Sequence, residues 1–176
     1  MRSLLVLACM LPTSVAFAEH EVLIKSGATV TYPRDDWSTK KEPRLRLGLE
    51  YRAVTSSENF LSGLYGIELA HQKLPVDWAD KPYDEYNLTF KLGLCFGYSI
   101  KLCPTIGTAQ HYINGDDNWY NHWGIHTSLN IVASPDDMPW LVSGFEVSKR
   151  YSTYRQNKVS VRWSKVDFSA LVGVKF

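Results

Sequence analysis

The stretch Asn87-Leu88-Thr89-Phe90-Lys91-Leu92-Gly93-Leu94-Cys95-Phe96-Gly97-Tyr98 decides the fold of this chain. Its even-numbered positions are aliphatic or aromatic, whereas its odd-numbered positions are polar, charged or small. A period of two is typical of a β-strand, because successive side chains of a strand point to opposite faces. One face of this strand therefore requires an apolar environment, and the other face does not.

The same alternation recurs along the rest of the chain and predicts eight strands. They are expected at residues 20–32, 44–54, 60–73, 86–98, 102–112, 121–133, 139–152 and 158–176. Long connections rich in Asp, Lys, Pro and Trp are expected at 33–43, 74–85 and 113–120, and short ones at 55–59, 99–101 and 134–138. The last hairpin turns around 153–157. A β-bulge is expected near Ser164-Lys165, where the apolar positions switch from odd to even.

The charges on the face opposite the apolar one decide between a soluble and a membrane barrel. That face carries Arg46, Glu50, Arg52, Glu68, Lys91, Glu146, Arg150 and Asp167. A secreted soluble barrel or sandwich also alternates, but it buries its aliphatic face. Charges inside and aliphatic residues outside fit lipid instead. The sequence therefore predicts an all-β, eight-stranded, antiparallel up-and-down transmembrane barrel with a polar, plugged interior.

The beginning of the chain has the pattern of a secretory signal peptide. Arg2 precedes the apolar run Leu4–Leu11, and Ala16-Phe17-Ala18 has the small-x-small pattern of a cleavage site. We therefore expect residues 1–18 to be a signal peptide and residues 19–176 to form one barrel domain. Of the 19 Lys and Arg, only Arg2 lies in the leader, which leaves 18 basic against 18 acidic residues. A neutral domain gives no reason to expect a nucleic-acid partner.

The closing strand resembles those of the small outer-membrane barrels, such as the OmpX-like proteins and the OmpA membrane domain. Its apolar positions alternate through Phe168 and Val174 to a C-terminal Phe176. The resemblance implies a location in the bacterial outer membrane. It also implies that the outer-membrane assembly machinery recognises this terminal strand. It assigns neither an activity nor a cofactor.

Cys95 and Cys103 lie symmetrically about Ser99. A hairpin centred on Ser99 would place them opposite each other, and an oxidising periplasm would permit a disulfide. The alternative is two small buried thiols.

One set of residues suggests acyl-transfer chemistry. A turn centred on Asp136 would place His126 opposite Glu146, with Ser128 beside them on the same face. A His-x-Ser pair with a nearby Glu resembles the outer-membrane lipid A deacylases, although Leu129 stands where that family has Asn. The alternative is that these residues belong to the polar interior. No metal site is expected, because His122 and His126 lie about 13 Å apart along one strand.

The last hairpin is basic, with no acidic residue between Glu146 and Asp167. Its basic residues are Lys149, Arg150, Arg155, Lys158, Arg162 and Lys165. They could bind lipopolysaccharide phosphates or an anionic host or extracellular ligand, or they could neutralise acidic residues of neighbouring loops. Two functions therefore stay open: a non-catalytic surface protein acting through its external loops, which we prefer, and a lipid A-modifying enzyme.

Overall fold

The structure, a computed structural model, describes residues 18–33, 43–55, 60–74, 82–115, 118–156 and 159–176. It contains eight strands: β1 (Ala18–Pro33), β2 (Arg44–Thr55), β3 (Leu61–Leu74), β4 (Tyr83–Gly97), β5 (Ile100–Gly115), β6 (Asn118–Ala133), β7 (Leu141–Gln156) and β8 (Val159–Lys175). Among these residues we find no helix with the length and apolarity needed to cross a membrane. The predicted signal peptide lies outside the described residues, apart from Ala18.

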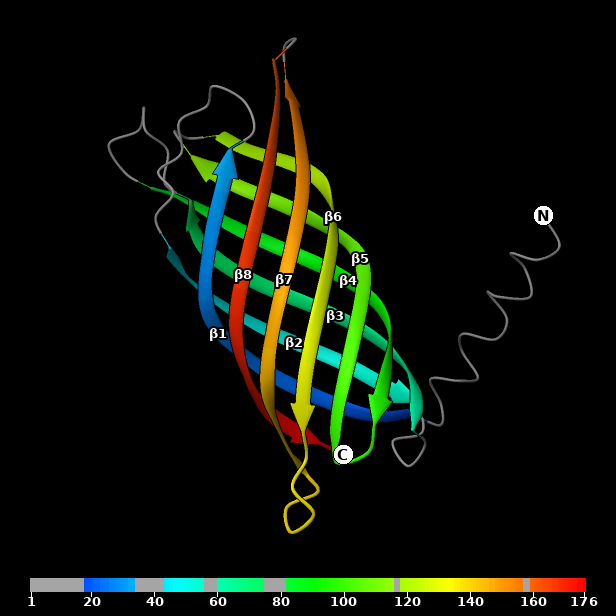
Figure 1. The fold of residues 1–176 in the computed structure, drawn as a ribbon. Helices are drawn as coiled ribbons and strands as arrows, with labels where there is room; N and C mark the ends of the chain where they lie inside the picture. The colour runs from blue at the N-terminus through cyan, green and yellow to red at the C-terminus, as the bar shows by residue number, and fades with distance from the viewer. Residues whose placement is uncertain (1–17, 34–42, 56–59, 75–81, 116–117, 157–158) are drawn as a thin grey trace, which may run out of the picture.

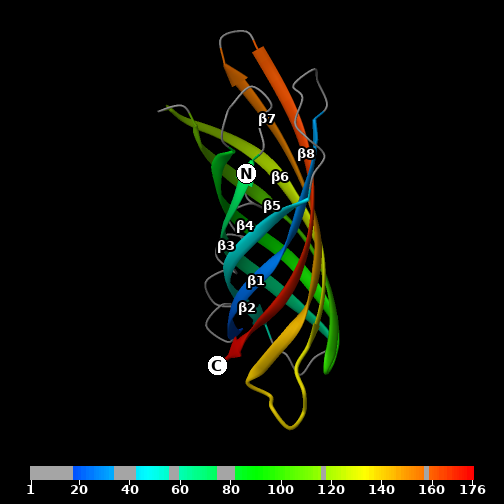
Figure 2. The ribbon, with the colours of Figure 1, turned by 90° about the vertical axis from the view of Figure 1, so that its left-hand side faces the viewer.

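The strands form a closed barrel in which each pairs with its neighbours in the sequence. All pairs are antiparallel, and β1 closes the barrel against β8. Figures 1 and 2 show the tilted strands wrapping around a single lumen. The predicted fold class is confirmed, because eight successive antiparallel strands return to the first one.

The two ends of the barrel differ. We call the end that carries the β4–β5 and β6–β7 turns and Phe176 the lower end, as drawn in Figure 1. The opposite end, where β5 meets β6 and β7 meets β8, is the upper end. At the upper end β7 and β8 reach beyond the wall, because residues 159–162 of β8 pair with β7 but not with β1.

Side chains alternate between the lumen and the outer surface, as the period of two predicts. In β4, Glu85, Thr89 and Lys91 are buried, whereas Phe90 and Leu92 are 44% and 55% exposed on the outer surface. The same pattern holds in every strand, and residues as apolar as Phe145 are 69% exposed. The barrel is therefore charged inside and aliphatic outside.

The polar interior that we expected also contains an apolar cluster toward its lower end. Each strand contributes one buried residue to a cluster there: Leu23, Val54, Leu64, Cys95, Cys103, Val132, Val142 and Leu171. Cys95 and Cys103 lie side by side across β4 and β5 and are joined by a disulfide. Gly97 opens the turn between these strands with a φ of 123°, a conformation that residues with a side chain rarely adopt.

Two local expectations were wrong. The connection expected at 113–120 is mostly strand, because β5 continues to Gly115 and β6 begins at Asn118. The bulge expected near Ser164-Lys165 does not form, since β8 keeps one register with β7 and one with β1 through these residues. The apolar positions change phase where β8 leaves the barrel wall, and a strand beyond the wall no longer has to alternate toward lipid.

Candidate functional site

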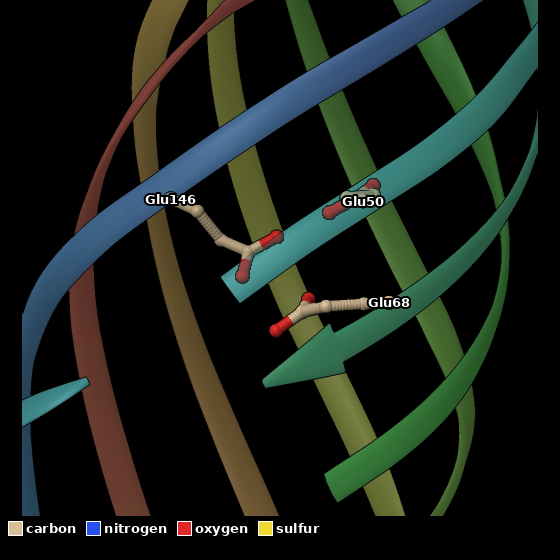
Figure 3. Close-up of side chains that lie close together, drawn as sticks. All are labelled: Glu50, Glu68 and Glu146. Carbon is tan, nitrogen blue, oxygen red and sulfur yellow. The ribbon is translucent and has the colours of Figure 1, made fainter. Parts of the chain in front are cut away.

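The centre of the lumen contains three carboxylates that meet from different strands. Glu50 of β2 and Glu68 of β3 are direct cross-strand partners, and Glu146 reaches them from β7. One carboxylate oxygen from each lies within 4.8 Å of the other two. Figure 3 shows the three carboxyl groups close together. Like charges placed opposite each other in a sheet repel, so this arrangement needs cations.

Two lysines supply those cations. The Lys25 ammonium donates to Glu68 at 2.7 Å, to Glu146 at 2.5 Å and to Glu50 at 3.1 Å. The Lys91 ammonium lies 2.9 Å from Glu50 and Glu146 and 2.5 Å from Glu68. Arg46 also donates to Glu68. Three cations thus balance three anions, and the position that a metal ion would take among the carboxylates is occupied by ammonium groups.

The charge balance extends to the whole described lumen. Six basic and six acidic side chains are buried there, none more than 6% exposed. They are Glu21, Lys25, Arg46, Glu50, Arg52, Glu68, Glu85, Lys91, Glu146, Arg150, Lys165 and Asp167. Removing charges from water is favourable only when each charge is paired and hydrogen-bonded. This network therefore fills the lumen as a plug of mutually dependent ion pairs.

A second polar layer lies nearer the upper end. Arg150 donates to Asp167 through two nitrogens, at 2.7 and 2.8 Å. Glu85 accepts hydrogen bonds from Lys165, from Gln72 at 2.8 Å and from His111 at 2.8 Å. This layer joins β3, β4, β5, β7 and β8 across the barrel.

The structure does not assemble the acyl-transfer site proposed from the sequence. The β6–β7 connection spans residues 134–140, so Glu146 pairs with Asn130 and His126 pairs with Arg150. Ser128 hydrogen-bonds to Thr105 at 2.6 Å, to Asn130 at 3.1 Å and to Glu146 at 3.3 Å. Neither ring nitrogen of His126 has a hydrogen-bond partner among the described residues. Ser128 therefore lacks the hydrogen bond to His126 that the proposed Ser-His-Glu arrangement requires.

The register error has a simple physical reason. We centred the turn on Asp136, whereas the chain makes two consecutive turns, with Met138 N donating to Pro135 O and Leu141 N donating to Met138 O. Each added residue in a hairpin connection shifts the opposing strand. The shift moves the partner of Glu146 four positions along β6, from His126 to Asn130.

The basic residues of the last hairpin lie on both sides of the barrel wall, some in the lumen and some on the outer surface. Arg150 and Lys165 are each 1% exposed and pair with Asp167 and Glu85 in the lumen, so their predicted place in an external binding set is wrong. Their inward positions in β7 and β8 explain this. Lys149 points outward, with its ammonium 4.8 Å from the centre of the Tyr151 ring. The side chains of Arg155 and Arg162, like the whole of Lys158, lie outside the described part.

Acidic residues at the upper end also lie on both sides of the barrel wall. Glu85 faces the lumen, whereas Asp84 faces outward and accepts hydrogen bonds from Lys73 at 2.9 Å and His71 at 2.6 Å. Asp84 lies at the upper edge of the wall, beyond Tyr86. These two hydrogen bonds, Lys73 foremost, lower the pKa of the Asp84 carboxyl below its ordinary value.

The residues expected to form the assembly signal lie on the outer surface, Phe168 in the middle of β8 and Val174 and Phe176 at the lower end. Phe168, Val174 and Phe176 are 54%, 44% and 72% exposed. The backbone of Phe176 exchanges two hydrogen bonds with His20 at 2.9 and 3.1 Å. The end of the chain is thereby fixed at the β1–β8 seam.

Comparison with known proteins identifies the fold. No described protein family and no curated protein matches the sequence. Among solved structures, the chain is similar to Ail, the attachment invasion locus protein of Yersinia pestis, with a TM-score of 0.52, 12% identity and coverage of 90% of this chain and 99% of that one. It is similar to Neisserial surface protein A, with a TM-score of 0.56, 13% identity and coverage of 89% and 97%.

A third similar structure is the outer membrane protein OprG of Pseudomonas aeruginosa, with a TM-score of 0.56, 10% identity and coverage of 91% and 97%. All three are small outer-membrane barrels. The chain therefore has the fold of the eight-stranded outer-membrane β-barrels, over nearly its whole length.

Proposed function

We propose that this chain is an integral protein of the bacterial outer membrane that binds anionic ligands at its upper end. The observation that carries the proposal is the inversion of the barrel, with aliphatic residues outside and paired charges inside. Exposed apolar surface of this extent is unfavourable in water but favourable in a hydrocarbon layer. The likeness to outer-membrane barrels supports the same location.

Aromatic residues at both ends of the wall support a membrane-spanning position. Tyr32, Tyr86 and Trp123 are 43%, 39% and 57% exposed toward the upper end. Tyr98 and Trp140 are 65% and 55% exposed at the lower end. Tyr and Trp favour the boundary between hydrocarbon and water, so two such belts are expected at the two interfaces.

The connections support an orientation. In outer-membrane barrels the short turns face the periplasm and the longer loops face outward. The two longest connections, residues 34–43 and 75–82, lie at the upper end, which also has the short connections 116–117 and 157–158; the lower end has 56–60, 98–99 and 134–140. We therefore place the lower end in the periplasm and the upper end at the cell surface.

The β7–β8 hairpin is the element that we propose binds ligand. It extends above the wall and carries Lys149, Arg155, Lys158 and Arg162, with tyrosines between them. Lysine and arginine bind phosphate and sulfate groups through charge-assisted hydrogen bonds. Ail has been crystallised with the heparin analogue sucrose octasulfate, which is a densely anionic ligand. The ligand class proposed here is therefore an anionic saccharide, either lipopolysaccharide or a sulfated host glycan.

The terminal strand suggests the partner needed for insertion. Phe176 is exposed at the lower end, directly after β8, which closes the barrel against β1. We propose that the outer-membrane assembly machinery recognises this strand from the periplasm after the signal peptide at residues 1–18 is removed.

Equilibrium binding to barrels embedded in phosphatidylcholine nanodiscs tests the ligand proposal. The probes are a sulfated oligosaccharide and the phosphorylated saccharide of lipopolysaccharide, each at two salt concentrations. We expect R155Q/R162Q to weaken binding at least about tenfold, equal to about 1.4 kcal/mol, and high salt to weaken wild-type binding. The matched control K101Q/K175Q removes two charges from the lower end and should bind like wild type. Equal losses in both double variants, or salt-independent binding, would contradict the proposal.

A further inference from the structure

Polar side chains occupy the outer wall of the barrel at the upper end of β3–β6, although a lipid-facing wall is expected to be apolar. Asp84 of β4 accepts hydrogen bonds from His71 and Lys73 of β3, at 2.6 and 2.9 Å. Gln110 of β5 donates to Asn121 of β6 at 3.1 Å. We call these five residues the polar wall surface.

The strand register joins these residues into one surface at the height of the aromatic belt. One cross-strand row runs from β3 to β6 through His71, Tyr86, Tyr112 and Asn121. The rings of His71 and Tyr86 lie 4.9 Å apart. On β2, the partner of His71 is Leu47, which is apolar and exposed. The polar wall surface therefore ends at β3 and lies at the level where Tyr and Trp mark the upper interface.

A groove lies lower on the same side of the wall, over β2–β5. It has a volume of about 390 Å³, and its outward-facing lining consists of Tyr51, Tyr65, Ile67, Phe90, Leu92 and Thr108. In a bilayer such a groove is filled by hydrocarbon, because an empty one would lose dispersion contacts. Thr108 is a small side chain directly beside Phe90, so a larger side chain there would fill part of the groove.

The groove and the polar wall surface are spaced like an acyl chain and the head of one lipid. Phe90 and Leu92 of the groove lie four and six residues along β4 from Tyr86. This separation is about 13–20 Å along the strand, or about 10–16 Å of depth for strands tilted by about 35–45°. One leaflet supplies about 15 Å of hydrocarbon. An acyl chain that descends from a head at the Tyr86 row therefore reaches the groove within the outer leaflet.

The residue types of the polar wall surface fit a sugar head that carries phosphate. Sugar hydroxyls both donate and accept hydrogen bonds, and the amides of Gln110 and Asn121 offer both functions. The Asp84 carboxylate accepts from hydroxyls. Lys73 is 50% exposed and supplies a cation for a phosphate group.

We propose that this side of the barrel binds one molecule of lipid A, the acylated and phosphorylated glucosamine disaccharide of lipopolysaccharide, from the surrounding outer leaflet. The disaccharide lies against the polar wall surface, and one acyl chain lies in the groove. The inference rests on the proposed membrane location and orientation. It does not require ligand binding by the β7–β8 hairpin.

Competition between two lipids on the wild-type barrel tests the proposal without any substitution. Barrels in phosphatidylcholine nanodiscs that contain equal amounts of lipid A and phosphatidylglycerol are released in a mass spectrometer, and the retained lipids are identified by mass. We expect one lipid A per chain, preferred over phosphatidylglycerol at least about tenfold. Equal retention of the two lipids would overturn the proposal, because acyl chains and one phosphate would then account for binding.

Matched variants test the two parts of the site. T108F fills part of the groove, and Q110L/N121L replaces the two amides by aliphatic side chains that suit a lipid-facing wall. Each should lower retention of lipid A at least about tenfold. The controls A170F and S164L make the same kinds of change at outward positions of β8 and should retain lipid A like wild type. A change of migration on boiling confirms that each variant is folded.

The hairpin variant R155Q/R162Q separates this inference from the proposed role of the β7–β8 hairpin. It should lose binding of the sulfated oligosaccharide but retain lipid A like wild type. If R155Q/R162Q lost lipid A while T108F and Q110L/N121L kept it, the lipid A site would be on the hairpin. That result would overturn the wall site and leave the hairpin proposal intact.

Discussion

Lys91 is the residue on which the charge balance of the lumen depends most directly. Its ammonium contacts all three central carboxylates, and its side chain is 1% exposed. We expect K91M to lower the free energy of unfolding by about 3–5 kcal/mol, because removing one partner leaves buried anions unpaired. Urea unfolding of the barrel in lipid vesicles measures this loss.

The matched control for K91M is K73M. Lys73 forms an ion pair with Asp84 at 2.7 Å, but its side chain is 50% exposed. The control should cost at most about 1 kcal/mol, since exposed pairs contribute little. Equal effects of the two substitutions would show that the lumen is hydrated and that its ion pairs are not a plug.

Ser128 tests whether the interior has an acyl-transfer role. Its hydroxyl hydrogen-bonds to Thr105, Asn130 and Glu146, not to His126. We expect S128A to cost about 1 kcal/mol of stability, as expected for lost hydrogen bonds. Lipid A mass spectra of cells expressing S128A and wild type should be identical. A modified lipid A species that disappears only in S128A would restore the enzymatic hypothesis.

Residue types and their alternation predict which side chains face inward, but not which of them meet. The inward positions of Glu50, Lys91 and Glu146 follow from period two alone. Their convergence depends on barrel closure and on the staggering of eight strands, which no local pattern encodes. Lys25, which contacts the same three carboxylates, was missed because the first strand alternates weakly. The sequence feature that places Lys25 inward is its position two residues after Leu23, because residues two apart in a strand point to the same face.

At the scale of elements, the β4–β5 hairpin is held by the Cys95–Cys103 disulfide. The chain has three cysteines, and Cys9 lies in the predicted signal peptide. The mature protein should therefore show no alkylatable thiol when denatured without reductant and two after reduction, as mass spectrometry would record. C95A/C103A should lose at most about 2–3 kcal/mol, the chain-entropy value for so short a loop. Two thiols before reduction would contradict the disulfide.

Strand existence is predicted well by sequence, whereas register depends on turns. The β4–β5 turn is short and directly follows Gly97, so its centre is evident, and the Cys95–Cys103 pairing follows. The β6–β7 connection contains two successive turns, and the predicted pairing of β6 with β7 was therefore displaced from the observed one. The cross-strand pairing of His111 with His122 was missed for a related reason. A hairpin centred between Asp116 and Asp117 sets these two residues opposite each other, but only if the strands continue through the polar residues around them.

At the scale of the molecule, the outer wall should tolerate charge only at its ends. Leu49 is 53% exposed in the middle of β2, and Tyr98 is 65% exposed at the lower turn. We expect L49R to lose about 2–4 kcal/mol and Y98R at most about 1 kcal/mol in lipid vesicles, because the cost of an arginine depends on depth in the bilayer. Equal costs at the two positions would show that lipid does not cover the wall.

The most direct test of a lipid-embedded barrel is fractionation of cells followed by electrophoresis of boiled and unboiled outer-membrane samples. The account predicts that the protein remains in the outer-membrane fraction after carbonate washing and migrates differently before and after boiling, because the closed barrel resists SDS until it is heated. A protein that is released as a soluble periplasmic species, with the same migration in both samples, would contradict the central claim.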